Sequence, residues 1–380
     1  MGSFCVIFIG VAKTKNKKRT VRQKAQAKKP SSLTYIKYIF IFLLLIIILV
    51  SLSRFFDADK PTQKVSGTAN LTDKQLEALS SKELYKSLDL RVAQLAVYKG
   101  APLVTTKNLG VFGGVNQSII KFPVYSANLV EYGLMTLPHS PAPAGGYPVI
   151  VLCHGYYNPP KYPTTKAYLG EMEYYSQHGF AVIKPDFRGN GLSANQGKPE
   201  GAFFSMAYNE DLLSLIASIK DTSFLNKNKI NLWGHSMGSY IALRAAIISP
   251  DIKNVILLSS PVGSLEEMYR DYTPTSDAAN PVAQFIKNTE FSKDGSPTSN
   301  PTFWDNASPI NFLKQTKATF QIHVGTDDKT VPPEFSAQLD NALTEAGKKH
   351  QYFVYYGGEH GLIPEMPIIL ERSLELLQKN

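Results

Sequence analysis

The sequence predicts an α/β fold, in which a mostly parallel sheet carries helices on both faces. A membrane-spanning helix is predicted N-terminal to this domain. Three observations support this prediction. Short apolar segments alternate with helix-like stretches between residue 121 and the C-terminus, and one of these segments leads through a Gly-x-Ser-x-Gly pentapeptide into a helix-like stretch. An uncharged apolar run follows a lysine-rich stretch near the N-terminus. Strand-helix alternation is typical of a parallel sheet. A long apolar run is typical of a membrane-spanning helix.

The positive charge of the chain is concentrated at its N-terminus. The formal net charge is +9, yet residues 1–54 hold eleven Lys or Arg and no Asp or Glu, so the remaining residues sum to −2. A nearly neutral body argues against a nucleic-acid-binding face, and no nucleic acid partner is expected. Residues 1–34 are predicted to form a basic cytoplasmic tail.

The apolar run that follows is predicted to be a transmembrane signal anchor, residues 35–53. Its central part, 38–52, carries no charge, and Lys37 can reach the interface, so the run approaches the ~20 residues that a spanning helix needs. The lysines on its N-terminal side place the N-terminus in the cytoplasm and the rest of the chain in the extracytoplasmic space, with the lipid bilayer as a partner. A cleaved signal peptide is the alternative, but Ser51-Leu52-Ser53 is a poor cleavage site.

Two further segments separate the span from the α/β domain. Residues 54–70 are polar, contain Pro61 and Gly67, and are predicted to be a linker. Residues 71–120 are predicted to be a helical extension, because Thr72 and Gln75 have the spacing of a capping box and helical periodicity continues, with a break, to Tyr98.

The α/β domain is predicted to occupy residues 121–380. Its apolar segments are expected to form strands, and residues 206–219 an amphipathic helix. The expected strands are 149–153, 180–185, 230–233, 256–258, 320–324 and 351–356. Residues 262–299 interrupt the alternation, and we expect a lid over the site, with Tyr269, Tyr272 and Phe285 as lining residues; a surface loop is the alternative.

The pentapeptide Gly234-His235-Ser236-Met237-Gly238 is predicted to be a nucleophile elbow. It follows the apolar residues 230–233 and precedes the helix-like residues 240–248, the context in which such a turn exposes a serine hydroxyl. Two chain segments downstream supply partners in the order Asp, then His. The strand 320–324 leads to the neighbouring Asp327 and Asp328, and the strand 351–356 leads to His360 between glycines.

These residues resemble the α/β-hydrolase superfamily, whose triads follow the order Ser, Asp, His. The resemblance selects Asp328, since it holds the fourth place of a G-x-x-D-x-x-V-P pattern, and leaves Asp327 as a loop residue. It also implies an oxyanion hole made by the backbone N–H groups of Tyr156, after the strand that ends in Cys153-His154-Gly155, and of Met237. The His154 side chain is expected only to order its own loop. Asp186 and Arg188, in a D-x-R-G-x-G loop, are expected to be structural.

Within this superfamily the chain resembles the catalytic domain of prolyl-oligopeptidase-like serine peptidases. The resemblance rests on residues 131–138, which lead to the strand and His-Gly at 147–155, and on residues 300–311 before the Asp328 strand. Two features depart from it. Some seventy residues between the span and Lys121 are too few for a propeller, whose blades need roughly 40–45 residues each. The elbow also carries His235 where many of these peptidases have an aromatic residue. Dienelactone-hydrolase-like esterases share the same motifs.

The expected activity is acyl transfer by a membrane-anchored serine hydrolase acting on a small peptide or ester substrate. Ser236 is the expected nucleophile, His360 the base and Asp328 the residue that orients it. The mechanism needs no cofactor, and no Cys/His cluster has metal-ligand spacing. Cys5 and Cys153 lie on opposite sides of the predicted span, and Cys153 is expected to be a core residue. An esterase is the alternative activity, and a binding protein on the same fold the alternative class.

Overall fold

A computed structural model of the chain describes residues 87–157, 161–193, 206–263 and 295–379. All of these residues belong to the unit Val65–Asn380. The predicted tail, membrane span and linker lie outside them, as does the first part of the predicted helical extension. No helix within the described ranges is long and apolar enough to span a bilayer.

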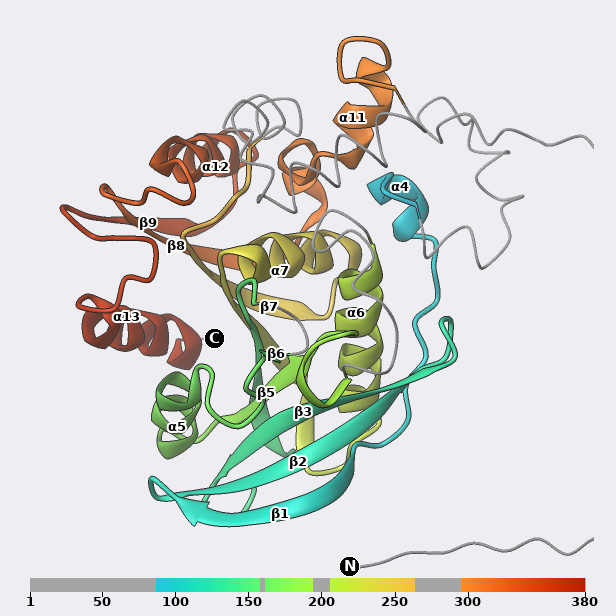
Figure 1. The fold of residues 1–380 in the computed structure, drawn as a ribbon, viewed down its shortest axis with the longest axis vertical. Coiled ribbons are helices and arrows are strands. Elements are labelled where there is room, and N and C mark those ends of the chain that lie inside the picture. Colours follow the sequence, from blue (N-terminus) through green and yellow to red (C-terminus); the bar gives the residue numbers. More distant parts are fainter. Residues whose placement is uncertain (1–86, 158–160, 194–205, 264–294, 380) are drawn as a thin grey trace, which may run out of the picture. The chain divides into compact units, whose positions relative to one another are not determined.

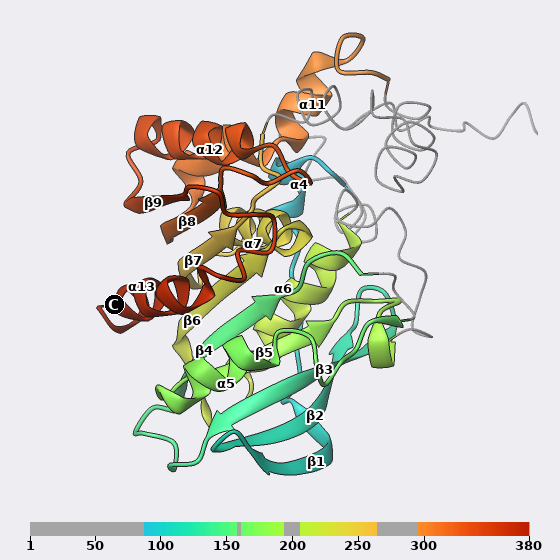
Figure 2. The same ribbon diagram turned by 60° about the vertical axis from the view of Figure 1, so that its left-hand side comes forward.

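The apolar segments of the sequence form a nine-stranded sheet with the order β1-β2-β3-β5-β4-β6-β7-β8-β9 (Figures 1 and 2). The first three strands form an antiparallel meander, and β3 is also antiparallel to β5. The other six strands are parallel to one another. The bounds are β1 (Val104–Phe112), β2 (Val115–Val124), β3 (Leu129–Pro138), β4 (Tyr147–Cys153), β5 (Ala181–Asp186), β6 (Leu225–His235), β7 (Ile252–Leu258), β8 (Thr319–Gly325) and β9 (His350–Tyr355).

Helices cover both faces of the sheet, as predicted. Helices α5 (Leu169–Gln177) and α13 (Met366–Gln378) pack on one face, while α6 (Ala207–Lys220), α7 (Met237–Ile248) and α12 (Pro333–Glu345) pack on the other (Figure 1). The central strands β4 and β5 are buried along nearly their whole length, because a parallel strand covered on both faces has no side open to water. Their continuous apolar runs in the sequence reflect this position.

The predicted helical extension is wrong over most of its described part. Only α4 (Leu90–Ala93) remains of the helix expected to reach Tyr98. Residues 104–124 form β1 and β2, so the boundary placed at Lys121 falls inside a strand. Gly113 and Gly114 join the two strands with φ of 56° and 74°, the positive values that a tight hairpin turn requires. The sequence hid this hairpin because β1 is almost wholly exposed and shows no clear alternation.

The segment before β8 contains α11 (Pro301–Ala307) and the 3₁₀ helix η6 (Pro309–Gln315). Of the insertion predicted as a lid, only residues 262–263 and 295–299 are described. Tyr269, Tyr272 and Phe285 lie outside the described residues.

Candidate active site

Ser236 lies in a sharp turn between β6 and α7. Its backbone has φ 53° and ψ −122°, a conformation that residues other than glycine rarely adopt. A Cβ atom on Gly234 would lie 2.5 Å from the carbonyl oxygen of Gly238, and one on Gly238 would lie 1.9 Å from that of Cys153. Both glycines of the motif are therefore required by close backbone packing. The turn has the geometry of a nucleophile elbow.

The structure brings Ser236, His360 and Asp328 together, although long stretches of chain separate them. His360 Nε2 lies 3.0 Å from Ser236 Oγ, and His360 Nδ1 lies 2.8 Å from Asp328 Oδ2. All three residues follow the carboxyl ends of parallel strands, at one edge of the sheet. The imidazole can accept a proton from the serine while it donates to the carboxylate.

Asp328 is held in place on both of its oxygens. Its Oδ1 accepts hydrogen bonds of 2.8 Å from the N–H groups of Thr330 and Val331, and its Oδ2 faces His360. Burial would raise the pKa of this carboxyl, but the hydrogen bond from His360 and those from Val331 and Thr330 outweigh it, so the pKa is lowered. Asp328 is therefore charged at neutral pH. Asp327, the other candidate in the sequence, has an exposed side chain.

The two backbone groups expected to form an oxyanion hole lie at element ends. Met237 is the first residue of α7, where N–H groups have no partner within the helix. Tyr156 lies three residues after the end of β4, in the loop beside the elbow. The N–H of Ser236 itself is already used, since it donates to the carbonyl of Leu258 at 2.9 Å.

Three residues to which the sequence assigned no role in the site contact it. His235 Nε2 and Ser259 Oγ lie 2.9 Å and 2.8 Å from the carbonyl oxygen of His360, and Tyr168 Oη lies 2.9 Å from His235 Nδ1. The position of His235 inside the elbow was the only signal for it in the sequence. Ser259 and Tyr168 reach the site through tertiary packing, which no local pattern reveals.

The two residues expected to be structural in the D-x-R-G loop make buried tertiary contacts. Arg188 donates to Asp211 at 2.9 Å and to Glu210 at 2.7 Å, which ties the loop to α6. Asp186 accepts hydrogen bonds from the hydroxyl of Thr164 and from the N–H of Leu192. These contacts fix the loop relative to its neighbours.

His154 is fully buried and stacks on Tyr162, with ring centroids 4.1 Å apart. Its Nδ1 donates to the carbonyl of Gly155 at 2.7 Å, as expected for a residue that orders its own loop. Burial lowers the pKa of His154 to about 3, so the ring is neutral at physiological pH. Cys153 is buried in β4, and burial raises the pKa of its thiol, as suits a core residue.

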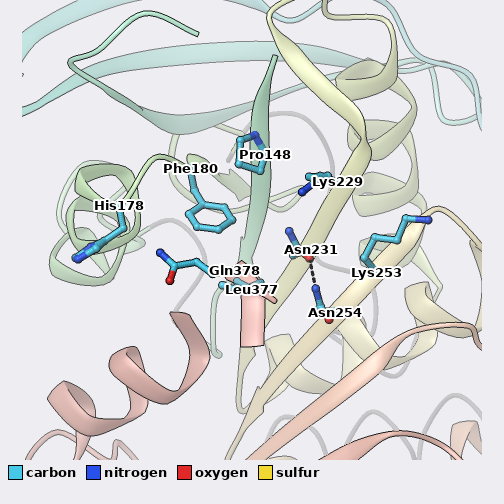
Figure 3. Close-up of a pocket in the computed structure, with 9 residues that line it drawn as sticks. All are labelled: Pro148, His178, Phe180, Lys229, Asn231, Lys253, Asn254, Leu377 and Gln378. Carbon is cyan, nitrogen blue, oxygen red and sulfur yellow. Dashed lines mark hydrogen bonds between the residues drawn. The ribbon is translucent and has the colours of Figure 1, made fainter. Parts of the chain in front are cut away.

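A pocket of about 200 Å³ lies near the amino-terminal ends of β4, β6 and β7 (Figure 3). It is therefore at the end of the strands opposite to Ser236, Asp328 and His360. Lys229, Asn231 and Asn254 help to line it, and none of the predicted site residues does. In the described part of the chain, no group of three or more His, Cys, Asp or Glu residues could hold a metal ion.

The comparisons with known proteins agree with this architecture. Residues 148–293 match the sequence model of the alpha/beta hydrolase fold. No curated protein matches the sequence. Among solved structures, the chain is similar to a puromycin hydrolase (18% identity, TM-score 0.54) and to dipeptidyl peptidase 4 of Porphyromonas gingivalis (16%, 0.50). It is also similar to an acetyl xylan esterase from Paenibacillus sp. R4 (18%, 0.56).

The shares of the chains that match differ between these structures. The matches cover 71%, 75% and 80% of this chain, in the order given above. They cover 46% of the puromycin hydrolase chain and 36% of the dipeptidyl peptidase chain, but 99% of the esterase chain. The chain therefore spans less than half the length of the puromycin hydrolase and of the dipeptidyl peptidase. Its strand order and these matches together establish that the chain has the α/β-hydrolase fold.

Proposed function

We propose that this chain is a serine hydrolase that transfers an acyl group through a covalent intermediate on Ser236. The observation that carries the proposal is the hydrogen-bonded line from Ser236 through His360 to Asp328, with the serine on a strained elbow. Each residue stands where its role requires it. The serine is presented above the sheet, the imidazole lies within reach of its hydroxyl, and a charged carboxylate lies behind the imidazole.

In this mechanism Ser236 Oγ attacks the carbonyl carbon of the substrate while His360 Nε2 takes the hydroxyl proton. The oxygen of the tetrahedral intermediate becomes negative and accepts hydrogen bonds from the N–H groups of Met237 and Tyr156. His360 then gives the proton to the leaving group, the carbon–leaving group bond breaks and an acyl-enzyme remains. Water, activated by His360, releases the acid and restores Ser236.

A peptidase is the activity that we favour, with a small peptide as substrate. The motifs at residues 131–155 and 300–311 support it, as does the likeness to the solved dipeptidyl peptidase 4. An esterase is the second candidate, because the match to the acetyl xylan esterase extends over nearly the whole of that chain. The triad geometry suits both reactions. They differ in the demand on His360, since an amine leaving group must be protonated as it departs.

The test compares an ester and an amide that carry the same acyl group, including a proline amide, by kcat/KM of the full chain in detergent. Ser236→Ala is the blank. Amide cleavage within about a hundredfold of ester cleavage supports the peptidase. Turnover of the ester alone makes the chain an esterase. Near-normal activity of Ser236→Ala overturns the assignment of Ser236 as the nucleophile. No turnover of either substrate, together with no labelling of Ser236 by a fluorophosphonate, leaves the binding-protein class.

We also propose that residues 35–53 anchor the chain in a membrane, with the N-terminus in the cytoplasm and the hydrolase domain on the other side. The length of the apolar run and the basic residues before it support this. After an alkaline carbonate wash, the full chain is expected in the membrane pellet and a chain that starts at residue 56 in the supernatant. Protease added to the extracytoplasmic side should digest the hydrolase domain and spare an N-terminal tag. Digestion of the tag alone reverses the topology.

A further inference from the structure

A line of three hydrogen bonds joins the loop after β4 to the loop that carries His360. The N–H of Gly155 donates to Tyr168 Oη at 3.0 Å. Tyr168 Oη lies 2.9 Å from His235 Nδ1, and His235 Nε2 lies 2.9 Å from the carbonyl oxygen of His360. The line passes beside Ser236, because His235 is its neighbour in the elbow. We call it the Tyr168–His235 bridge.

The two ends of the bridge fix the direction of every hydrogen bond in it. A backbone N–H can only donate and a carbonyl can only accept. Tyr168 therefore accepts from Gly155 and donates its own proton to His235 Nδ1, and His235 carries its proton on Nε2. Burial lowers the pKa of His235 to about 4, which keeps this neutral form at physiological pH. A second proton on His235 would face Tyr168 and break the line.

At its first end the bridge fixes the peptide that leads to Tyr156. Tyr168 holds the N–H of Gly155, and His154 Nδ1 holds the carbonyl of Gly155 at 2.7 Å. The carbonyl of Gly155 and the N–H of Tyr156 belong to one trans peptide and point in opposite directions. The N–H of Tyr156 thus points away from His154. Its orientation depends on the contacts that hold Gly155.

Close packing at Gly155 leaves no room for a side chain between the two bridge residues. A Cβ atom there would lie 2.9 Å from Tyr168 Oη and 3.1 Å from His235 Nδ1. Tyr168 itself has φ 55°, a conformation unusual for a residue with a bulky side chain. At the other end, the carbonyl of His360 accepts from both His235 and Ser259. The base is therefore held through its backbone as well as through Asp328.

We propose that Tyr168 and His235 are positioning residues of the proposed serine hydrolase, which hold the oxyanion loop and the His360 loop in register with Ser236. This inference rests on the proposed function. Neither side chain hydrogen-bonds to the reacting atoms, although the His235 ring lies beside that of His360, with centroids 5.0 Å apart. Their hydrogen bonds go to the backbone of Gly155 and His360. A small displacement of such groups costs on the order of a hundredfold in rate. Loss of the bridge should therefore lower kcat and leave KM nearly unchanged, because ground-state binding does not use these groups.

The experiment compares Tyr168→Phe with Tyr162→Phe in the full chain in detergent. Tyr162 is six residues away, and its hydroxyl has no hydrogen-bond partner among the described residues. On a p-nitrophenyl ester, with rates corrected for the fraction of active sites, Tyr168→Phe should lower kcat by roughly 10- to 100-fold with KM within about twofold. Affinity for phenylboronic acid, which forms a tetrahedral adduct on the serine, should fall by a similar factor. Tyr162→Phe should match the wild type.

Two variants of His235 complete the series. His235→Gln keeps an acceptor for Tyr168 and a donor for His360, so it should retain more activity than His235→Leu. The double variant Tyr168→Phe/His235→Leu should be little worse than the poorer single variant, since both break one line. If Tyr168→Phe and His235→Leu both turn over like the wild type while Ser236→Ala is inactive, the proposal is wrong and the hydrolase stands.

A second readout does not depend on turnover. In Tyr168→Phe, hydrogen–deuterium exchange should quicken at the near end of the bridge, 154–157, and also at the far end, 358–361. Unchanged exchange at 358–361 would show that the two loops are not coupled, whatever the activity. If the wild type neither hydrolyses esters nor reacts with a fluorophosphonate, the proposed function fails. Faster exchange at both ends in Tyr168→Phe would then still show that the two loops are coupled.

Discussion

Asp328 illustrates how a single atom can set the tautomer of His360, the proposed base. Its Oδ1 is occupied by two backbone N–H groups, so only Oδ2 faces His360 Nδ1. In Asp328→Asn the amide oxygen should keep the two N–H contacts, and the NH₂ group should then face the imidazole. This favours the tautomer with its proton on Nε2, which cannot take the proton of Ser236.

We therefore expect Asp328→Asn to lower kcat by about 10⁴-fold, the loss that a wrong tautomer causes in such triads. The matched control is Asp327→Asn, because Asp327 is the adjacent exposed residue and should tolerate the change. Steady-state kinetics of the two variants on one ester measure the difference. A greater loss in Asp327→Asn than in Asp328→Asn would reverse the assignment of the carboxylate.

Buried neutral histidines predict a loss of stability toward acid pH. His154 and His323 are fully buried, and burial lowers the pKa of each to about 3, against about 6.5 in an unfolded chain. Between these values the unfolded state binds protons that the folded state does not. Their stabilising contribution is complete above about pH 6.5 and declines as the pH falls, by about 1.4 kcal/mol per pH unit for each histidine.

This expectation is tested by urea unfolding between pH 6 and 4.5. His323→Gln, which lies outside the proposed site, should reduce the slope of unfolding free energy against pH by about 1.4 kcal/mol per unit. The matched control is His178→Gln, the same substitution at an exposed histidine. Equal slopes in His323→Gln and the wild type would contradict a buried neutral imidazole at this position.

At the scale of elements, the elbow depends on how closely α7 approaches the end of β4. Gly238→Ala would place a Cβ atom 1.9 Å from the carbonyl oxygen of Cys153. The helix would have to move, and Ser236 at its start would move with it. We expect the unfolding free energy to fall by about 3 kcal/mol or more, and labelling of Ser236 by a fluorophosphonate to be lost.

A second glycine provides the control for this prediction. Gly170 lies in the first turn of α5, and a Cβ atom there would meet no atom within 4 Å. Gly170→Ala should leave labelling intact and raise stability by up to about 1 kcal/mol, because alanine favours the helix. Similar behaviour of the two variants in urea unfolding would show that the close approach of α7 to β4 is not required.

At the scale of the whole molecule, β1 and β2 extend the domain beyond the boundary predicted at Lys121. Phe122 on β2 is buried, with 1% of its surface exposed, whereas Phe112 on β1 is 57% exposed. Phe122→Ala should therefore lower the unfolding free energy of the hydrolase domain by about 3–5 kcal/mol, through lost burial and the cavity left behind.

Phe112→Ala, the same substitution on the neighbouring strand, should change the unfolding free energy by no more than about 0.5 kcal/mol. Thermal or urea unfolding of the whole chain is monitored by the loss of Ser236 labelling. The same transition then gives the unfolding free energy of both variants. If Phe122→Ala left that transition unchanged, β2 would not belong to the cooperative core of the domain.

The sequence by itself determined the parallel strands, the helices α6 and α7, the elbow and the residues proposed for the triad. These features are encoded locally: buried strands appear as apolar runs, amphipathic helices by their periodicity, and the elbow by glycines that relieve a crowded turn. The order Ser236, Asp328, His360 added a resemblance to known hydrolases. The membrane anchor and the topology of the chain remain predictions from the sequence.

Only the tertiary structure decided the features that depend on contacts between distant segments. The edge strand β1 lacks an apolar pattern because it is exposed along almost its whole length, so its hairpin with β2 became visible only through pairing. The contacts of His235, Tyr168 and Ser259 with the backbone around the site join residues from different strands and loops. A local pattern records burial along one segment, and it does not record which side chain of another segment completes a hydrogen bond.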